Sequence, residues 1–298
     1  MIKFLLISLL CIFPQIITAQ TKLSDWAVEA ESKESKVSLT SDGSIDIIAP
    51  KGLTLWYKRQ MQGNVIIEYD AQIVVEEHNN NTWNRLSDLN CFWQATDPKQ
   101  KDGSVLRGIP KRKGIFANQY ALSLYYMGYG GNYNSTTRFR RYNGNENGVK
   151  DPSFRPAILR EYTDPGHILK PNHWYHIRLE QHFGHVRYII DGECIVDYLD
   201  IRPFYRGYFG FRTTLAHAQI RNFIYSETPV SGTPVSLHWV GRKPNSSASP
   251  QTFGIPFLQG EVLPSQSILL QTDNGKQIPN DSWTLAYWPD GSVKWKAV

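Results

Sequence analysis

The chain has 298 residues, of which 41% are hydrophobic and 13% aromatic, and its formal net charge is +5. This length gives ample material for a hydrophobic core and allows one large domain, either alone or together with a small one. The positive charge is mild and comes without a dense basic tract or a nucleic-acid-binding motif. No nucleic-acid partner is therefore expected, whereas the many Trp and Tyr residues suit an anionic glycan.

The first 19 residues have the pattern of a signal peptide. Lys3 supplies a positive charge, Phe4–Ile17 is an almost unbroken apolar run, and Ala19 offers a small residue for cleavage. The apolar run is shorter than the roughly 20 residues of a membrane-spanning helix, and no later segment approaches that length. We therefore expect an exported protein, periplasmic or secreted, without membrane contact after the signal peptide is removed.

The pattern of the following 200 or so residues is that of strands. Short runs rich in β-branched and aromatic residues alternate with clusters of Asn, Gly, Asp and Pro. The runs are Val37–Ile48, Val65–Val75, Tyr120–Met127, Thr136–Tyr142, Trp174–Glu180, Val186–Asp191 and Tyr208–Arg212. Many short strands with polar turns predict an all-β jelly-roll sandwich. The charged segment 99–113 is predicted to be a long exposed loop.

A domain boundary is predicted near Tyr225, where Ser, Pro and Gly become frequent. We place a sandwich domain at residues 20–226, a linker at 227–234 and a smaller second unit at 235–298. The second unit again contains strand-like runs, such as Trp283–Trp295.

Two cysteines, Cys91 and Cys194, follow the signal peptide, and both lie in apolar strand-like runs. Their positions leave a disulfide and two buried free thiols as open alternatives, because the sequence gives no distance between them. No Cys and His spacing resembles a zinc site, and no cofactor is predicted. A structural Ca²⁺ is compatible with a jelly roll, but spacing alone does not place its ligands.

Strand alternation predicts a polar outer face shared by three neighbouring strands. Apolar side chains of each strand face inward, which turns the residues between them outward. The predicted glycan-binding residues are Arg138, Arg140, Tyr142, His176, Arg178, Tyr208 and Arg212. Guanidinium groups pair with carboxylate or sulfate groups, so the expected partner is an acidic polysaccharide. The alternative is a solvated face with local ion pairs, such as Arg178 with Glu180.

Catalytic residues stay unassigned at this level. The Glu-x-Asp-x-x-Glu pattern with which jelly-roll glycoside hydrolases pair an acid and a nucleophile is absent. A lyase instead needs an Arg to neutralise the substrate carboxylate and a Tyr or His base. Arg140, His176 and Tyr208 are the candidates for these two roles.

Several segments of the first domain resemble a concanavalin-A-like, laminin-G-like jelly roll. The strands that close such a fold are matched by Trp174–Arg178, Ile189–Glu193, Gly207–Thr213 and Ile220–Phe223. Three further segments resemble, more narrowly, a jelly-roll module of polysaccharide-degrading proteins from Bacteroidetes. They are Ser87–Pro98, Tyr125–Asn132 and Thr136–Tyr142. The resemblance spans residues 25–226 and implies a concanavalin-A-like sandwich there.

A second resemblance lies near the C-terminus, in Phe253–Phe257, Gly260–Val262, Trp283 and Tyr287–Trp295. These segments look like the opening of the N-terminal β-barrel domain of exo-acting rhamnogalacturonan lyases and of the related ulvan lyases of polysaccharide lyase family 40. In that group a β-sandwich and an α/α toroid follow the barrel, and the catalytic cleft depends on them. Because the chain stops at Val298, the resemblance implies an incomplete barrel and a truncated lyase.

The two resemblances and the cationic face predict one function. We expect the carbohydrate-engaging N-terminal portion of an exported polysaccharide lyase that takes part in degrading acidic rhamnose-containing polysaccharide, ulvan or rhamnogalacturonan. Other domains or proteins of the same lyase system are the expected protein partners. Whether this chain is itself an enzyme stays open, because the catalytic domains of these β-eliminating lyases are missing from it. Two alternatives remain: a jelly roll that is itself a small uronate-polysaccharide lyase, and a structural or docking domain without glycan affinity.

Overall fold

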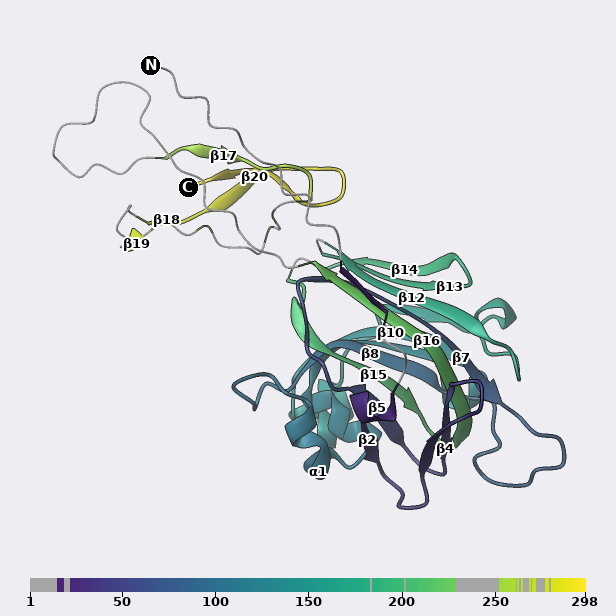
Figure 1. Cartoon of the computed structure of the whole chain (residues 1–298). Helices are drawn as coiled ribbons and strands as arrows, with labels where there is room; N and C mark the ends of the chain where they lie inside the picture. The colour runs from purple at the N-terminus through teal and green to yellow at the C-terminus, as the bar shows by residue number, and fades with distance from the viewer. Residues whose placement is uncertain are drawn as a thin grey trace, which may run out of the picture.

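The computed structural model describes residues 15–18, 22–182, 184–200, 202–228, 252–260, 262, 264, 268, 270–271, 277–278 and 280–298. Within these residues two eight-stranded antiparallel sheets face each other as a sandwich (Figure 1). The β7 sheet has the strand order β14, β13, β12, β7, β16, β4, β3, and the β8 sheet has the order β11, β10, β9, β8, β15, β5, β2. The predicted all-β sandwich is confirmed.

The strands and short helices have the following bounds. The β7 sheet contains β14 (Glu193–Leu199), β13 (His185–Ile190), β12 (Tyr175–His182), β7 (Asn64–Val74), β16 (Ala216–Thr228), β4 (Ile45–Ala49) and β3 (Lys36–Leu39), with β1 (Gln15–Thr18) beside β16. The β8 sheet contains β11 (Arg160–Tyr162), β10 (Thr136–Asn143), β9 (Ser123–Gly130), β8 (Leu89–Thr96), β15 (Arg206–Thr213), β5 (Leu53–Tyr57) and β2 (Trp26–Ala30), with β6 (Met61–Gln62) beside β15. The helical segments are η1 (Leu23–Asp25), η2 (Leu106–Gly108), α1 (Ile109–Arg112), η3 (Phe116–Ala121), α2 (Gly131–Asn134), α3 (Asn147–Lys150), η4 (Pro152–Phe154) and η5 (Pro165–His167). In the C-terminal unit β17 (Gly254–Pro256), β21 (Val293–Ala297) and β20 (Trp283–Tyr287) form one sheet, and β18 (Leu270–Gln271) pairs with β19 (Gln277–Ile278).

The main core lies between the two sheets, because alternate side chains of the long strands point inward. Phe139 of β10, Ile177 of β12 and Phe209 of β15 belong to it, and each is 0% exposed. Burying a side chain of this size stabilises the fold by roughly 1.5–3 kcal/mol. The rings of Trp26 and Phe223 add an edge-to-face contact, with their centroids 4.9 Å apart. The predicted inward orientation of the apolar residues on these strands is confirmed.

A second hydrophobic cluster covers the outer face of the β8 sheet. Residues 105–122, which we call the cover segment, contain η2, α1 and η3 and pack on this face (Figure 1). Tyr120 of the cover segment lies against Tyr142 of β10, with their ring centroids 5.2 Å apart. The prediction of an exposed loop at residues 99–113 is therefore wrong for its second half, where Val105 is 0% and Arg112 is 5% exposed. Trp56 lies on this outer face and is 0% exposed. Burying such a large ring away from water stabilises the fold.

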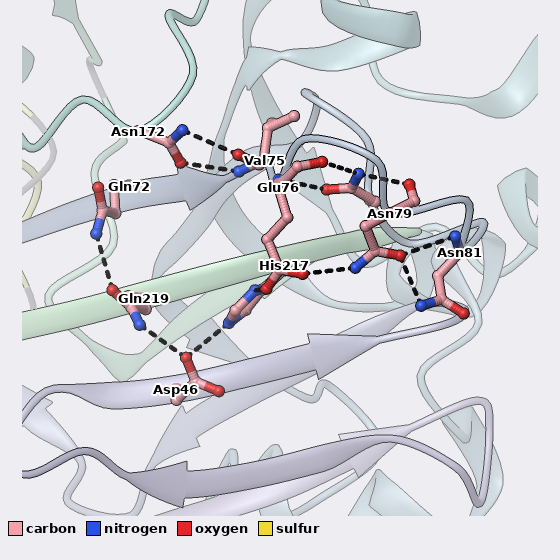
Figure 2. Close-up of polar contacts among 10 residues, drawn as sticks. Asp46, Gln72, Val75, Glu76, Asn79, Asn81, Asn172, His217 and Gln219 are labelled. Atoms are coloured by element: carbon pink, nitrogen blue, oxygen red, sulfur yellow. Dashed lines mark hydrogen bonds and ion pairs between the residues drawn. The ribbon is translucent and has the colours of Figure 1, made fainter.

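A ladder of hydrogen bonds crosses three strands on the outer face of the β7 sheet (Figure 2). Gln72 Nε2 donates to Gln219 Oε1 over 2.8 Å, and Gln219 Nε2 donates to Asp46 Oδ1 over 2.8 Å. His217 Nε2 lies 2.7 Å from the same Asp46 oxygen. The His217 ring also packs edge-on against Trp83. The ladder ties β7, β16 and β4 together and fastens the segment that follows β7 to the sheet.

The two cysteines are both free thiols, Cys91 buried on β8 and Cys194 exposed on β14. Of the two alternatives left open by the sequence, the disulfide is therefore excluded. The expectation of two buried thiols holds for Cys91 alone.

Two predicted segments fall largely on residues outside the described ranges. Residues 1–14 of the predicted signal peptide and its cleavage site after Ala19 are not described, while residues 15–18 form β1. The strand β16 ends at Thr228, and residues 229–234 of the predicted linker are also outside the described part. Among the described residues, no helix is long and apolar enough to cross a membrane.

Candidate functional site

A row of residues crosses the outer face of the β8 sheet at one level. Paired residues on neighbouring antiparallel strands point to the same side of a sheet, so their side chains are neighbours. The row consists, in order across the sheet, of Glu161, Arg138, Gly128, Asn90, Arg212, Thr54 and Glu29. Gly128 has no side chain, and the Tyr126 phenol occupies the space over it.

Glu29 ends the row and fastens the cover segment to the sheet. Its carboxylate is 0% exposed. Oε2 accepts from Trp56 Nε1 over 2.8 Å and from Arg112 Nη2 over 2.7 Å. Oε1 accepts from Gln119 Nε2 over 2.7 Å and from the Gly114 N–H over 3.2 Å. The buried charge is tolerated because both oxygens are saturated by donors, and three of these donors belong to the cover segment.

The cover segment ends beside the row and leaves a pocket of about 430 Å³ on the outer face of the β8 sheet. Four arginines and three aromatic residues line it, and they are Arg138, Arg140, Arg155, Arg212, Phe116, Tyr120 and Tyr126. The lining contains two carboxylates, those of Glu31 and Asp88. Four positive against two negative groups give the pocket a net positive charge.

Arg212 is the most buried of the four arginines, with 2% exposure. Its Nη1 donates to Thr54 Oγ1 and to the Gly114 carbonyl, each over 3.0 Å, and its guanidinium lies 5.1 Å from the centre of the Phe116 ring. No carboxylate of the described residues lies within 4.0 Å of this guanidinium. Burial lowers the pKa of Arg212, because the charged group has lost most of its water without gaining a close anion.

The other three pocket arginines are more open to solvent. Arg138 Nε donates to Glu161 Oε1 over 2.6 Å, and Arg140 Nη1 donates to the Pro156 carbonyl over 2.7 Å. Arg155 is exposed and lies 5.1 Å from the centre of the Tyr120 ring. A guanidinium has five N–H donors, so each of these side chains keeps donors for a ligand.

Two further polar groups on the pocket floor lack partners. Asn90 is 2% exposed; its Nδ2 donates to Asp88 Oδ1 over 3.1 Å, but its Oδ1 accepts no hydrogen bond. The Tyr126 hydroxyl lies directly over Gly128, where a Cβ would collide with it. Burial raises the pKa of Tyr126, so the hydroxyl stays protonated and can donate as well as accept.

The structure thus brings Arg138, Arg140 and Arg212 of the predicted site into one pocket. Tyr142 and Tyr208 lie on the same face of the β8 sheet, but they are 0% and 8% exposed. Both belong to the hydrophobic cluster under the cover segment. The prediction that these two rings contact a sugar is therefore wrong, because the chain itself already covers them.

His176 and Arg178 lie on the other sheet, which corrects the prediction that all three strands adjoin. Their strand β12 pairs with β7 and β13, so both side chains face outward from the opposite side of the sandwich. Arg178 contacts Glu68 and donates from Nε to Glu180 Oε1 over 2.7 Å. The local ion pairs that were the alternative interpretation of this face are confirmed.

The candidate catalytic trio is also corrected. Arg140 lines the pocket, Tyr208 is buried under the cover segment, and His176 lies beyond the main core on the β7 sheet. A base and the cation that neutralises the substrate carboxylate must reach the same sugar unit. These three residues cannot do so together.

His176 makes the stability of the fold depend on pH. Its pKa is raised from 6.5, chiefly by its hydrogen bond to Asp70, and Glu68 adds to the effect. A folded-state pKa above the unfolded value means that the protonated ring stabilises the fold fully below pH 6.5, and that this contribution is lost as pH rises through the raised pKa. We expect His176→Gln to lower the free energy of unfolding near pH 5.5 by less than about 1 kcal/mol, because the side chain is half exposed, and to change it less near pH 9. Urea unfolding at the two pH values measures the difference, and an equal loss at both would contradict it.

The pocket residues that sequence reasoning missed include Asn90, Phe116, Tyr120, Tyr126 and Arg155. Asn90 and Tyr126 had a usable signal, because they alternate with Cys91 and with other core residues of β8 and β9. Phe116 and Arg155 come from η3 and from the end of η4. These segments have no period-two pattern, so alternation gives no information about them.

Metal binding has no candidate residues in the described ranges, where no group of three or more His, Cys, Asp or Glu side chains could hold an ion. The expectation that a structural Ca²⁺ is compatible with the fold stays a prediction.

The fold and the pocket define a β-sandwich module with a cationic, aromatic-walled pocket on one outer face. The sequence profile of the family described as domain of unknown function DUF6250 matches residues 47–223, more than half of the chain, so the protein belongs to this family. The profile of the PcRGLX-like N-terminal RIFT barrel domain matches residues 233–298. No curated protein matches the sequence.

Solved structures with a similar fold include a Bacillus subtilis protein of unknown function with a galectin-like fold. It is 16% identical, with a TM-score of 0.51, over 73% of this chain and 96% of that one. The carbohydrate-binding module CBM66 from Bacillus subtilis is 14% identical, with a TM-score of 0.44, over 68% of this chain and 96% of that one. The galectin-like match confirms the predicted jelly-roll fold of the sandwich.

Proposed function

We propose that the sandwich is a carbohydrate-binding module that holds an acidic polysaccharide in the pocket on the β8 sheet. The observation that carries this proposal is the lining of that pocket, with four guanidinium groups, two carboxylates and three aromatic rings. Guanidinium groups pair with carboxylates and sulfates. Of the three rings, Phe116 is the one that is partly exposed and can pack on the apolar face of a sugar, whereas Tyr120 and Tyr126 are 6% and 8% exposed. A neutral ligand would leave the excess positive charge of the pocket without a counterpart.

A polysaccharide lyase is the proposed setting of this binding module. The match of residues 233–298 to the PcRGLX-like N-terminal RIFT barrel domain supports this setting. Segments within the same residues resemble the N-terminal barrel of exo-acting rhamnogalacturonan lyases. We propose that the chain is the carbohydrate-engaging N-terminal portion of an exported lyase and that its polymer is ulvan or rhamnogalacturonan. The pocket would then keep the polymer near catalytic domains or partner proteins of the same lyase system.

The alternative of a lyase within the sandwich has no support from the chemistry of the pocket. No histidine is among its described lining residues, and burial raises the pKa of the Tyr126 phenol. A general base works best with a pKa near the working pH. We therefore expect the purified chain to bind acidic polymers without producing the ultraviolet absorbance of unsaturated uronate.

The double variant Arg138→Ala with Arg140→Ala tests the binding site. Both side chains keep free donors at the rim of the pocket, so their loss should weaken binding to ulvan or rhamnogalacturonan by at least about tenfold. Affinity electrophoresis in gels that contain each polymer measures the retardation. Added salt should weaken the binding of the natural chain, because the rim contacts are exposed to screening.

The matched control is Arg178→Ala with Arg187→Ala, which removes the same charge from the outer face of the β7 sheet. This control should be retarded like the natural chain. Equal retardation of all three proteins would mean that Arg138 and Arg140 do not contribute to glycan binding. No retardation of the natural chain by any acidic polymer would favour a structural or docking domain without glycan affinity.

A further inference from the structure

Three polar groups on the pocket floor have no hydrogen-bond partner in the described chain, and they come from three adjacent strands. They are Nη2 of Arg212 on β15, Oδ1 of Asn90 on β8 and the hydroxyl of Tyr126 on β9. Buried polar groups in folded proteins are nearly always hydrogen-bonded, because an unpaired one has lost its water without compensation. Asn90 Oδ1 is such a buried, unpaired atom, and the side chains of Arg212 and Tyr126, which line the same pocket, are 2% and 8% exposed. Together they indicate a site built for a ligand.

The acids near Arg212 do not neutralise it. Glu29 is saturated by donors from β5 and the cover segment, and Asp88 accepts from Arg85 over 2.9 Å and from Asn90. Glu31 lines the pocket, but its carboxylate is more than 4.0 Å from the guanidinium and accepts from a backbone N–H instead. A cation buried in this way attracts an anion strongly, and the pocket is the route by which one reaches it.

Asn90 determines what can lie beside that anion. Asn90 and Arg212 are direct cross-strand partners, so their side chains are neighbours on the floor. The free Oδ1 accepts hydrogen bonds only, and a sugar hydroxyl is the donor that a polysaccharide offers. The Tyr126 phenol covers Gly128, and we place the ring that carries both groups beside the Tyr126 hydroxyl, in the pocket that Asn90 and Arg212 line.

We infer that the pocket floor recognises one acidic sugar unit: its anionic substituent pairs with Arg212, and a neighbouring hydroxyl donates to Asn90 Oδ1. The anionic substituent is a carboxylate or a sulfate ester, which share this chemistry. Arg138, Arg140 and Arg155 hold adjoining units of the polymer by less selective attraction. This inference rests on the proposed function and names the sugar unit that the same site recognises.

Isothermal titration calorimetry of the full chain separates the two anionic groups. Oligosaccharides from ulvan and from rhamnogalacturonan are compared with their carboxyl-reduced derivatives and, for ulvan, with the desulfated one. We expect the derivative that lacks the recognised group to bind at least about tenfold more weakly, since a charge-assisted hydrogen bond is lost. Loss on carboxyl reduction identifies a uronate, and loss on desulfation identifies a sulfate ester.

Two substitutions test the floor directly. Arg212→Lys keeps the charge but lacks the planar fork, and Asn90→Ala removes the free acceptor without changing any charge. Each should weaken binding at least about tenfold. Asn90→Ala keeps the test valid if Arg212→Lys does not fold, because its structural loss is the single hydrogen bond to Asp88. Arg187→Lys and Asn80→Ala make the same changes away from the pocket and should bind like the natural chain.

The failure of this inference and the failure of the proposed function give different results. If the natural chain binds none of the acidic oligosaccharides, the proposed function is wrong. A second outcome is that the natural chain binds them while neither folded floor variant changes Kd, or while the neutral derivatives bind equally well. In either case the proposed function stands, but Arg212 and Asn90 do not recognise the acidic sugar unit. Circular dichroism melting of each variant verifies that it is folded.

Discussion

Replacing Glu29 with Gln is expected to lower the free energy of unfolding by about 3–5 kcal/mol, measured by urea unfolding at neutral pH. The substitution removes the charge that faces Arg112, which is 5% exposed and has Asp97 only at 3.7 Å as a second acid. The new amide also replaces one carboxylate oxygen with an N–H₂ group. This group faces either the donors of Trp56 and Arg112 or those of Gln119 and Gly114. A buried cation without its partner and a donor facing donors both destabilise the folded state.

The same substitution should weaken glycan binding, because Glu29 holds the cover segment that supplies Phe116 and Tyr120 to the pocket. Glu34→Gln is the matched control, since Glu34 is exposed, and it should change stability by less than about 0.5 kcal/mol. The pair Glu29→Leu with Arg112→Met removes both charges and should recover part of the loss. A loss below about 1 kcal/mol for Glu29→Gln would contradict the buried network described above.

The sandwich itself could be predicted because its strands carry a period-two pattern over most of their length. On β10 and β12 the apolar positions, such as Phe139 and Ile177, alternate with polar ones, and burial follows the same alternation. Alternation is a local property of the chain, since it depends only on which side of one strand each residue faces. Alternation therefore predicts reliably which side of its own strand each side chain faces.

The same property explains why only part of the site was predicted. Alternation assigned Arg138, Arg140 and Arg212 to an outer face, but it contains no information about which sheet a strand joins. The strand of His176 pairs with β7, about a hundred residues earlier in the chain. Nothing within the strand marks that partner, because the pairing is decided by the packing of the whole sandwich. The cover segment was missed for a related reason, since its helical turns show no period of two.

A β-bulge in β8 is a further feature that the sequence did not reveal. Tyr208 pairs with Ala95 and Gly210 with Phe92, so β8 has one residue more than β15 at this point. Gln94 takes a positive φ of 49° there. The extra residue reverses the alternation, and both Phe92 and Ala95 reach the outer cluster although they are three positions apart.

Replacing Gly207 with Ala is expected to cost about 3 kcal/mol in the free energy of unfolding, at the upper end of the range for overpacked sites. A Cβ at position 207 would collide with the backbone of Gln94 and Ala95, next to the bulge. Backbone atoms cannot rotate away as the end of a side chain can, so β15 and β8 would have to separate or shift. These two strands carry Arg212 and Asn90, and the substitution should weaken glycan binding as well as stability.

Gly131→Ala is the matched control, because the nearest atom to a Cβ at that position lies 3.7 Å away, which is an ordinary contact. Urea unfolding should place this variant within about 0.5 kcal/mol of the natural chain. Equal stability of the two alanine variants would mean that β15 and β8 do not approach as closely as described. The bulge would then not fix the register that puts Arg212 beside Asn90, and recognition of an acidic sugar by this pair would lose its structural basis.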